Sequence, residues 1–289
     1  SIKRSYPGLE GLMNVVGLGK AGCAIANSIS EYPQYTAYKI DNGAKGDRCF
    51  DFPLHDHPEE YEKAAPDMTE FFRDIEGEVV FILSGASRIS GACLRILQHL
   101  RDCKVTIIYI KPNLDTLEDI KVRMHRVCFG VLQEYVRSAV FERMIIVEND
   151  SVESILGQVP IMGYYDSLNK AITWTFHMLN VLKNSEAVMG KVNDTKETSR
   201  ISTIGTVDID SGEEKMFFSL DNIREKCYFY LLKGEDLRTD GNLLKTITKQ
   251  VKELRSEDSR SSYAIYSSEY EQNYIFSFYH TPYIQVEDQ

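Results

Sequence analysis

The chain has 289 residues, of which 43% are apolar and 26% are charged, so it is long enough for one large or two modest globular domains with a real core. Its net charge of −10 disfavours direct binding to a nucleic-acid backbone, and no apolar run approaches the roughly 18 residues of a membrane-spanning helix. Because the first residues lack an apolar signal core and the six cysteines form no CxxC pair, we expect a cytoplasmic protein with reduced thiols and no membrane insertion.

The first half of the sequence alternates between patterns typical of strands and of helices. The apolar spacing predicts strands at 14–16, 36–40, 78–83, 104–110 and 144–147, and helices at 21–30, 67–74, 91–100 and 117–139. This alternation is typical of a parallel sheet with helices on both faces. The tripeptide His55-Asp56-His57 has residue types that bind metals, but no second cluster matches it, so we expect a solvated loop there and no metal site.

The second half begins with a long helix and then changes rhythm. Residues 166–182 are apolar on nearly every side, which predicts a buried helix as long as a domain is wide, with Trp174 and Met178 in the core. Further strands are expected at 215–220, 226–232, 262–267 and 273–280, and an amphipathic helix at 241–254 with Asp240 as its N-cap. We therefore expect an α/β domain at 1–165, a central helix and linker at 166–190, and a smaller α+β domain at 191–289.

A glycine-rich turn, within NVVGLGKAGCAIANSI at 14–29, joins the first strand to the first helix. Gly17 permits a tight turn, Gly19 lets the backbone approach phosphates, and Gly22 lets helix and strand pack closely. A dinucleotide-binding fold is one interpretation, because Asp41 ends the second strand about 20 residues after Gly22, where an acid can bond a ribose hydroxyl. A glycine turn used only for packing is the other interpretation that this motif alone allows.

Several later segments decide which nucleotide the glycine-rich turn would hold. Together with that turn, they resemble the tubulin/FtsZ superfamily from the first strand to the last. VVFILSGASRISGA resembles the family's phosphate-gripping loop, and DTLEDIKVRMHRVCFGVLQEYVRSAVFERMIIVEND resembles its long helix and the following strand. YYDSLNKAI resembles the start of the central helix, and VNDTKETSRISTIG resembles the loop and helix that carry the hydrolytic acids. The resemblance implies an α/β fold with a Rossmann-like parallel-sheet nucleotide-binding domain, a long central helix and a smaller α+β C-terminal domain.

The same resemblance implies a site for GTP or GDP with Mg²⁺. Residues implied to wrap the phosphates with backbone N–H groups are Gly17, Gly19, Lys20, Ala21, Gly22 and Cys23, and residues implied to grip them from the other side are Ser87, Ser90 and Gly91. Residues implied to face the sugar and the guanine base are Asp119, Arg123, Asn149, Tyr165 and Asn169. In the dinucleotide interpretation, Asp41 holds the ribose instead.

Two acids match the catalytic loop of the family. Asp194 and Glu197 keep the spacing of its two hydrolytic acids, and Gly205 keeps the glycine that follows. The resemblance implies that head-to-tail assembly inserts these acids into the neighbouring subunit's site, where they orient a water for attack on the γ-phosphate. The implied partners are other copies of the chain and an adaptor protein. Capping of a helix is the alternative role for both acids.

Two departures from the family pattern keep other functions open. SGASRISG is shorter than the family's loop and keeps only Gly85 and Gly91, and Asn193 and Asp194 are adjacent where the family has a residue between them. The shortened loop favours a structural or scaffold protein on the same fold that does not hydrolyse GTP. An NAD-dependent oxidoreductase is the third hypothesis, for which no spacing points to a catalytic residue.

Overall fold

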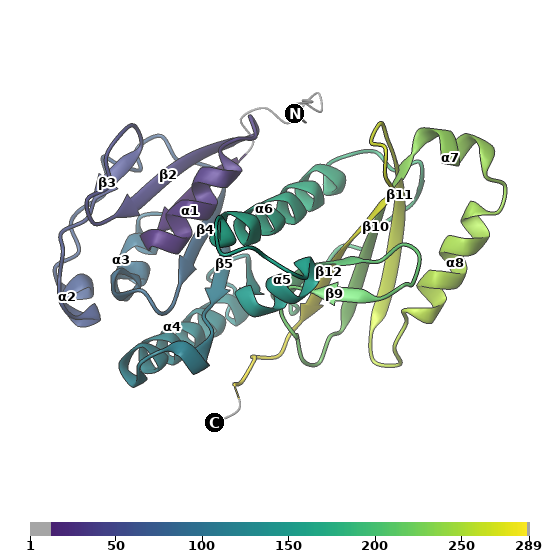
Figure 1. Cartoon of the computed structure of the whole chain (residues 1–289). Coiled ribbons are helices and arrows are strands. Elements are labelled where there is room, and N and C mark those ends of the chain that lie inside the picture. Colours follow the sequence, from purple (N-terminus) through teal and green to yellow (C-terminus); the bar gives the residue numbers. More distant parts are fainter. Residues whose placement is uncertain (1–12, 288–289) are drawn as a thin grey trace. The chain divides into compact units, whose positions relative to one another are not determined.

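The structure of the chain, a computed structural model, describes residues 13–287 (Figure 1). The chain divides into two compact units. The first ends at Thr173 and the second begins at Trp174, so the boundary lies within helix α6 (Tyr164–Lys183). Among the described residues, no helix combines the length and the apolar character that crossing a membrane requires.

Within its described residues, the first unit is built on a sheet of parallel strands. These are β1 (Met13–Leu18), β2 (Tyr35–Asp41), β3 (Cys49–Asp51), β4 (Glu78–Ser84), β5 (Lys104–Lys111) and β6 (Arg143–Glu148). They lie in the order β3-β2-β1-β4-β5-β6, and each neighbouring pair is parallel. The middle of β4 and most of β5 are buried, as expected of strands covered on both faces. The α/β class predicted from the sequence is confirmed.

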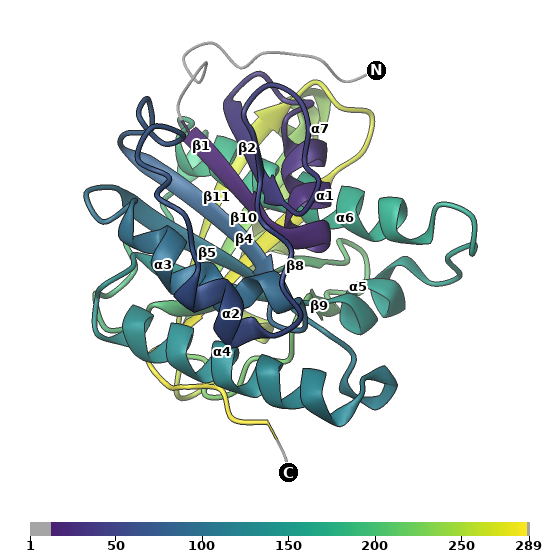
Figure 2. The same cartoon turned by 90° about the vertical axis from the view of Figure 1, so that its left-hand side faces the viewer.

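Helices lie on both faces of this sheet. They are α1 (Gly19–Ile29), α2 (Pro58–Lys63), α3 (Cys93–Gln98), α4 (Asp119–Arg137) and α5 (Asn149–Leu156), with short 3₁₀ helices η1 (Arg88–Ala92) and η2 (Leu114–Thr116). Figure 2 shows α1 on one side of the strands and α3 and α4 on the other. The chain moves from β1 to β2 in one direction and from β4 to β5 in the other, so right-handed crossovers place α1 and α3 on opposite faces. The order reverses between β1 and β4, where open parallel sheets bind ligands at the carboxyl ends of the strands.

Two glycines let α1 lie directly on the sheet. A Cβ atom on Gly17 would lie 2.4 Å from the carbonyl oxygen of Gly22, and one on Gly22 would lie 2.3 Å from the carbonyl oxygen of Ile82 in β4. Any side chain at either position would push the helix away from the strands. Close packing of helix and strand therefore accounts for both glycines.

The second unit is an α+β structure around a mixed sheet. Its strands are β7 (Met189–Gly190), β8 (Ile201–Val207), β9 (Glu214–Met216), β10 (Glu225–Lys233), β11 (Arg260–Ser268) and β12 (Tyr274–Thr281). They lie in the order β8-β12-β10-β11-β7, with β9 beside β8, and β10 and β11 form the parallel pair. Helices α7 (Gly234–Thr239) and α8 (Leu243–Glu253) connect that pair, and α8 packs Ile247 and Val251 into the core of this unit.

The helix predicted at 67–74 was wrong, because the segment forms turns instead. The Asp67 carboxylate accepts hydrogen bonds from the backbone N–H and the hydroxyl of Thr69, a local pattern that competes with a helix. A helix forms earlier, at α2, where Pro58 occupies the first turn and the Glu60 carboxylate accepts from the backbone ahead of it.

The segment that resembles a loop and helix before Gly205 was also predicted wrongly. Residues 191–200 form an irregular loop, and the described chain has no helix between Lys183 and β8. Strand β8 reads ISTIGTV, and its β-branched residues favour a strand. No helix is therefore present here for Asp194 or Glu197 to cap, which excludes the capping alternative.

Two smaller expectations in the second unit also need correction. The residue that precedes α8 is Asn242 and not Asp240, and the Asp240 carboxylate accepts from the Asn242 backbone N–H at 3.0 Å. The strand predicted at 215–220 is short, because β9 ends at Met216.

Candidate functional site

The glycine loop and the loop after β4 meet at the carboxyl edge of the parallel sheet. Gly19 has a φ of +73°, which L side chains rarely adopt, and a Cβ there would lie 3.0 Å from Ser87 Oγ and 3.1 Å from Ile89 Cγ2. Neither α1 nor η1 has an acidic residue in its first turn, and Lys20 and Ala21 are exposed in the first turn of α1. Two helix starts without a side-chain cap, a glycine and a serine hydroxyl suit an anion such as a phosphate.

Cys23 ties α1 to the end of β2. Its thiol donates to the carbonyl oxygens of Gly17, at 3.4 Å, and Ile40, at 3.5 Å. Burial, followed by the nearby Asp41 carboxylate, raises the pKa of the Cys23 thiol to about 12, so the side chain is a neutral donor. The Asp41 carboxylate accepts from the backbone N–H of Asn42 at 2.8 Å, which turns it toward the β2–β3 connection.

Two of the predicted phosphate-gripping residues have packing contacts. The buried Ser90 hydroxyl donates to the Ser84 carbonyl at 2.7 Å and so closes the loop on the end of β4. A Cβ on Gly91 would lie 2.3 Å from the Pro58 carbonyl oxygen, so this glycine allows η1 to approach α2. Ser87 is therefore the residue of the three that lies beside Gly19.

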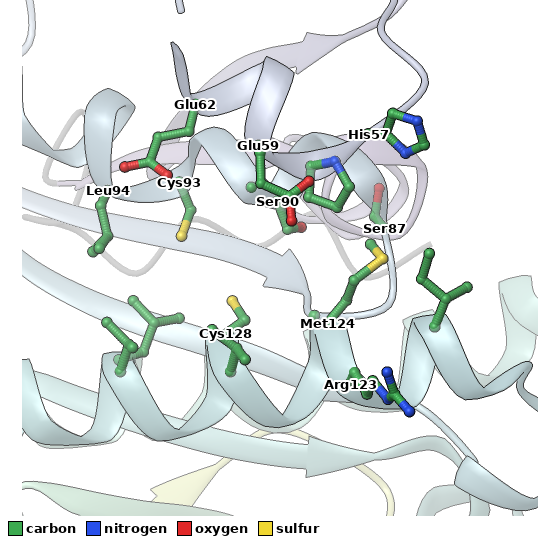
Figure 3. Close-up of a pocket in the computed structure, with 17 residues that line it drawn as sticks. His57, Glu59, Glu62, Ser87, Ser90, Cys93, Leu94, Arg123, Met124 and Cys128 are labelled. Atoms are coloured by element: carbon green, nitrogen blue, oxygen red, sulfur yellow. The ribbon is translucent and has the colours of Figure 1, made fainter.

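A cavity of about 580 Å³ lies next to this loop, between α2, η1–α3 and α4 (Figure 3). Four predicted site residues line it: Ser87, Ser90, Gly91 and Arg123. Met124 and Cys128 face the cavity from α4, and Glu59 and Glu62 lie on the α2 side. Carboxylates beside a phosphate would repel it, so the acidic wall disfavours phosphate in this cavity. Asp119, the exposed first residue of α4, lies one turn before Arg123.

The residues predicted to hold a base come from two adjoining helices. Asn149 begins α5 directly after β6, and Tyr165 and Asn169 lie near the start of α6. The Tyr164 hydroxyl donates to the Glu153 carboxylate at 2.6 Å, which ties the start of α6 to α5 and raises the pKa of Tyr164 to about 12. The Tyr165 side chain is 67% exposed, so its ring is available for stacking.

The two predicted catalytic acids lie in the second unit, on the loop at 191–200. Both Asp194 and Glu197 are exposed. Gly205 lies in β8, where a Cβ would come within 2.5 Å of the Lys215 carbonyl oxygen, so its role is to let β9 pack against β8. The structure thus brings Gly19 and Ser87 together in the first unit and carries the acids on the second.

Sequence reasoning missed the side chains that hold this acid loop. Glu225 begins β10, Arg260 begins β11, and the two are register partners that form an ion pair. The sequence signal was two opposite charges that lie just before the strands predicted at 226–232 and 262–267. It could be used only if those two strands were known to pair. A second missed ion pair joins Lys111 and Glu148 at 3.1 Å, at the carboxyl ends of β5 and β6 next to Asn149.

Solved structures of tubulin-like proteins share this fold. The GTPγS-form protofilament of TubZ from Bacillus thuringiensis serovar israelensis matches with a TM-score of 0.69 and 14% identity over 93% of this chain and 86% of that chain. A type III plasmid segregation TubZ matches at 0.67 and 15% over 94% and 89%. The empty FtsZ dimer of M. jannaschii matches at 0.67 and 11% over 94% and 88%. The chain therefore has a tubulin/FtsZ-like fold, as predicted.

The sequence itself carries little of this likeness. No protein-family model matches the chain, and no curated protein matches its sequence. At identities this low, the similarity defines the fold and leaves the activity to be argued from the site.

Proposed function

We propose that this chain is a tubulin-like filament protein that binds a guanine nucleotide and assembles head to tail. The observation that carries the proposal is the meeting of Gly19 with Ser87 at the point where the strand order reverses. It is supported by the fold, which the chain shares with a TubZ solved as GTPγS-form and GDP-form protofilaments. A two-stranded filament of TubZ is a further structure of the same fold.

On the nucleotide side, the proposed roles follow from position. Backbone N–H groups at the start of α1 and the Ser87 hydroxyl would hold phosphates, and the exposed Lys20 would offset their charge. Asn149, Tyr165 and Asn169 would hold the guanine base. Mg²⁺ would enter with the nucleotide, because among the described residues no cluster of three or more His, Cys, Asp or Glu forms a ready-made metal site.

Hydrolysis would need a second copy of the chain. Asp194 and Glu197 belong to the second unit and the glycine loop to the first, and both acids are exposed on a loop. In the proposed contact, these carboxylates enter the neighbouring subunit's site, orient a water and accept its proton. Such a contact joins two different surfaces and does not close on itself, so it propagates into a filament.

A scaffold that assembles without hydrolysing GTP is the second candidate. The loop after β4 favours it, because the apolar Ile89 side chain lies close to Gly19 and Gly91 packs against Pro58. Fewer backbone groups are then free for phosphates than a glycine-rich loop would offer. The dinucleotide interpretation with Asp41 is the third candidate, since its fold uses the same strand order.

Calorimetric titration of nucleotide-free protein separates the three candidates. The protein is titrated with GTP in the presence of Mg²⁺ and, in parallel, with NADH, and each sample is then sedimented to measure polymer. The proposal expects micromolar or tighter binding of GTP, no binding of NADH, and polymer that depends on GTP. Polymer without GTP binding supports the scaffold, and binding of NADH alone refutes the proposal.

The hydrolytic part has its own variant. Asp194→Asn removes a carboxylate from an exposed position and should fold, bind GTP and form polymer like the unaltered chain. Its GTP turnover should fall by about a hundredfold or more, because a water in the neighbouring site loses its base. Unchanged turnover would remove Asp194 from the mechanism.

A further inference from the structure

The acid loop has no regular secondary structure, yet an ion pair between an exposed arginine and a buried carboxylate fixes its backbone. Arg260 donates through Nη2 both to the Glu225 carboxylate and, at 2.9 Å, to the Asp194 carbonyl oxygen. The Glu225 carboxylate also accepts from the backbone N–H of Lys196 at 3.2 Å. One ion pair thus binds the chain at Asp194 and again two residues later, immediately before Glu197.

Two further side chains, Ser262 and His280, contact the residues between and before these points. The Ser262 hydroxyl accepts from the backbone N–H of Asn193 at 2.9 Å. The Thr195 hydroxyl lies 3.4 Å from Nε2 of His280, whose Nδ1 is 2.6 Å from the Ser202 hydroxyl. Each of the four consecutive residues 193–196 therefore has a contact with β10, β11 or β12.

The burial of Glu225 makes its carboxylate depend on the donors that surround it. The residue is 3% exposed, while the Arg260 side chain keeps 43% of its surface in solvent. A buried carboxylate is costly unless charged and polar donors surround it, and here the donors are Arg260 and the loop backbone itself. The buried carboxylate therefore depends on the loop, and the loop on the carboxylate.

We propose that Glu225 and Arg260 are positioning residues, which fix the backbone of the acid loop, with Asp194 and Glu197 exposed, before two subunits meet. This inference rests on the proposed function, because it assigns the loop's fixed shape to placing Asp194 and Glu197 in a neighbouring site. A carboxylate that must hold a water for in-line attack acts only within a narrow range of positions. A loop formed in advance also loses less conformational freedom when the subunits bind.

Three variants of the full chain test the proposal. Arg260→Met removes the ion pair and the bond to Asp194. Arg260→Lys keeps a positive charge, but its side chain is one bond shorter and lacks the planar guanidinium whose Nη2 reaches both acceptors. Lys233→Gln is the matched control, because it removes the ion pair with Asp236 at the other end of β10. Each variant is measured for amide exchange across 191–199, GTP affinity, sedimented polymer and GTP turnover per polymerised subunit.

The two Arg260 variants should exchange the amides at 193–196 at least tenfold faster than the unaltered chain, with exchange elsewhere in β10–β12 preserved. Their turnover should fall at least tenfold at unchanged GTP affinity and polymer mass, with Arg260→Lys the milder of the two. Lys233→Gln should match the unaltered chain in all four measurements.

Unchanged exchange at 193–196 in Arg260→Met overturns the inference, and so does faster exchange with full turnover. If Arg260→Met loses exchange protection throughout the second unit, the ion pair serves overall stability in that variant. The milder Arg260→Lys variant then decides, by its amide exchange at 193–196 and its GTP turnover. Absence of GTP turnover in the unaltered chain refutes the hydrolytic part of the proposed function and the positioning role with it, whereas failure of the inference alone leaves the unaltered chain active.

Discussion

A methyl group on Gly19 is the smallest change that separates a phosphate site from a packing turn. Gly19→Ala forces a side chain into a φ of +73°, which costs about 1–2 kcal/mol of folding stability. It also places a Cβ 3.0 Å from Ser87 Oγ, so the two loops must separate by a few tenths of an ångström. If backbone N–H groups here hold a phosphate, losing one charged hydrogen bond costs about 1.5–3 kcal/mol, or roughly ten- to hundredfold in the Kd for GTP.

Gly77→Ala is the control for strain alone. Gly77 has a φ of +75°, nothing lies within 4 Å of its would-be Cβ, and it precedes β4 at the end away from Ser87. Both variants should therefore lose the stability that a strained φ costs, and Gly19→Ala should lose more through its contact with Ser87. Calorimetry should show weaker GTP binding in Gly19→Ala only. Equal affinities in the two variants would refute the reasoning, because Gly19 would then serve the turn and not a ligand.

Three further predictions concern groups outside that loop. Gly91→Ala should destabilise the first unit by about 1–3 kcal/mol through its contact with Pro58, which a lower Tm would show. A folded Gly91→Ala variant that bound GTP a hundredfold more weakly would contradict a packing role. Burial lowers the pKa of His177 to about 4, so the unfolded chain binds more protons below about pH 6.5 and stability is lost as the pH falls toward 4. The free energy of unfolding in urea should fall by about 2 kcal/mol between pH 7.5 and pH 5 in the unaltered chain, and this fall should be absent from His177→Gln. The same fall in both proteins would exclude His177 as its cause. Because the pKa of Cys23 is about 12, its thiol should react with iodoacetamide at pH 9 roughly a hundredfold or more slower in the native chain than in the urea-unfolded chain. Mass spectrometry can measure both rates, and similar rates would contradict the burial of Cys23.

The first unit was largely predictable because its signals are local. Apolar runs such as VVFIL in β4 fix buried strands, and the long helical spacing from Ile120 to Val136 fixes α4. The turn at Gly17, Gly19 and Gly22 marks where a strand feeds a helix, which the structure places between β1 and α1. These patterns depend on neighbours a few residues apart, so they can be read without knowing which strands pair.

The errors occurred where local signals were weak or where a distant contact decides. Helix α2 has only six residues, too few for a periodic pattern, and its capping by Glu60 decides where it forms. At Gly91 the resemblance predicts a phosphate contact, and the structure adds a packing contact with Pro58 that requires glycine and that no local pattern could reveal. The resemblance of 192–205 implied a helix after Asp194 and Glu197, whereas the strand β8 begins at Ile201.

The candidate site was predictable in its residue types and less so in its geometry. Ser87 and Ser90 are both serines of the loop after β4, and the sequence does not distinguish their roles. In the structure, Ser87 lies beside Gly19, whereas the Ser90 hydroxyl donates to the Ser84 carbonyl. Glu225 and Arg260 are 35 residues apart and become partners only through the register of β10 and β11. Sequence patterns give the chemical types that such a site requires, and strand pairing decides which of them meet.

GTP turnover in a mixture of two variants tests the central claim most directly. One is Gly19→Ala, with a weakened nucleotide site and intact acids; the other is Asp194→Asn, with an intact nucleotide site and an impaired acid loop. If the acids act on the neighbouring subunit, equimolar copolymers should turn over GTP at about a quarter of the unaltered rate, because random head-to-tail contacts join an intact site to an intact loop about that often. A mixture no faster than the average of the two variants alone would contradict assembly-coupled hydrolysis by this chain.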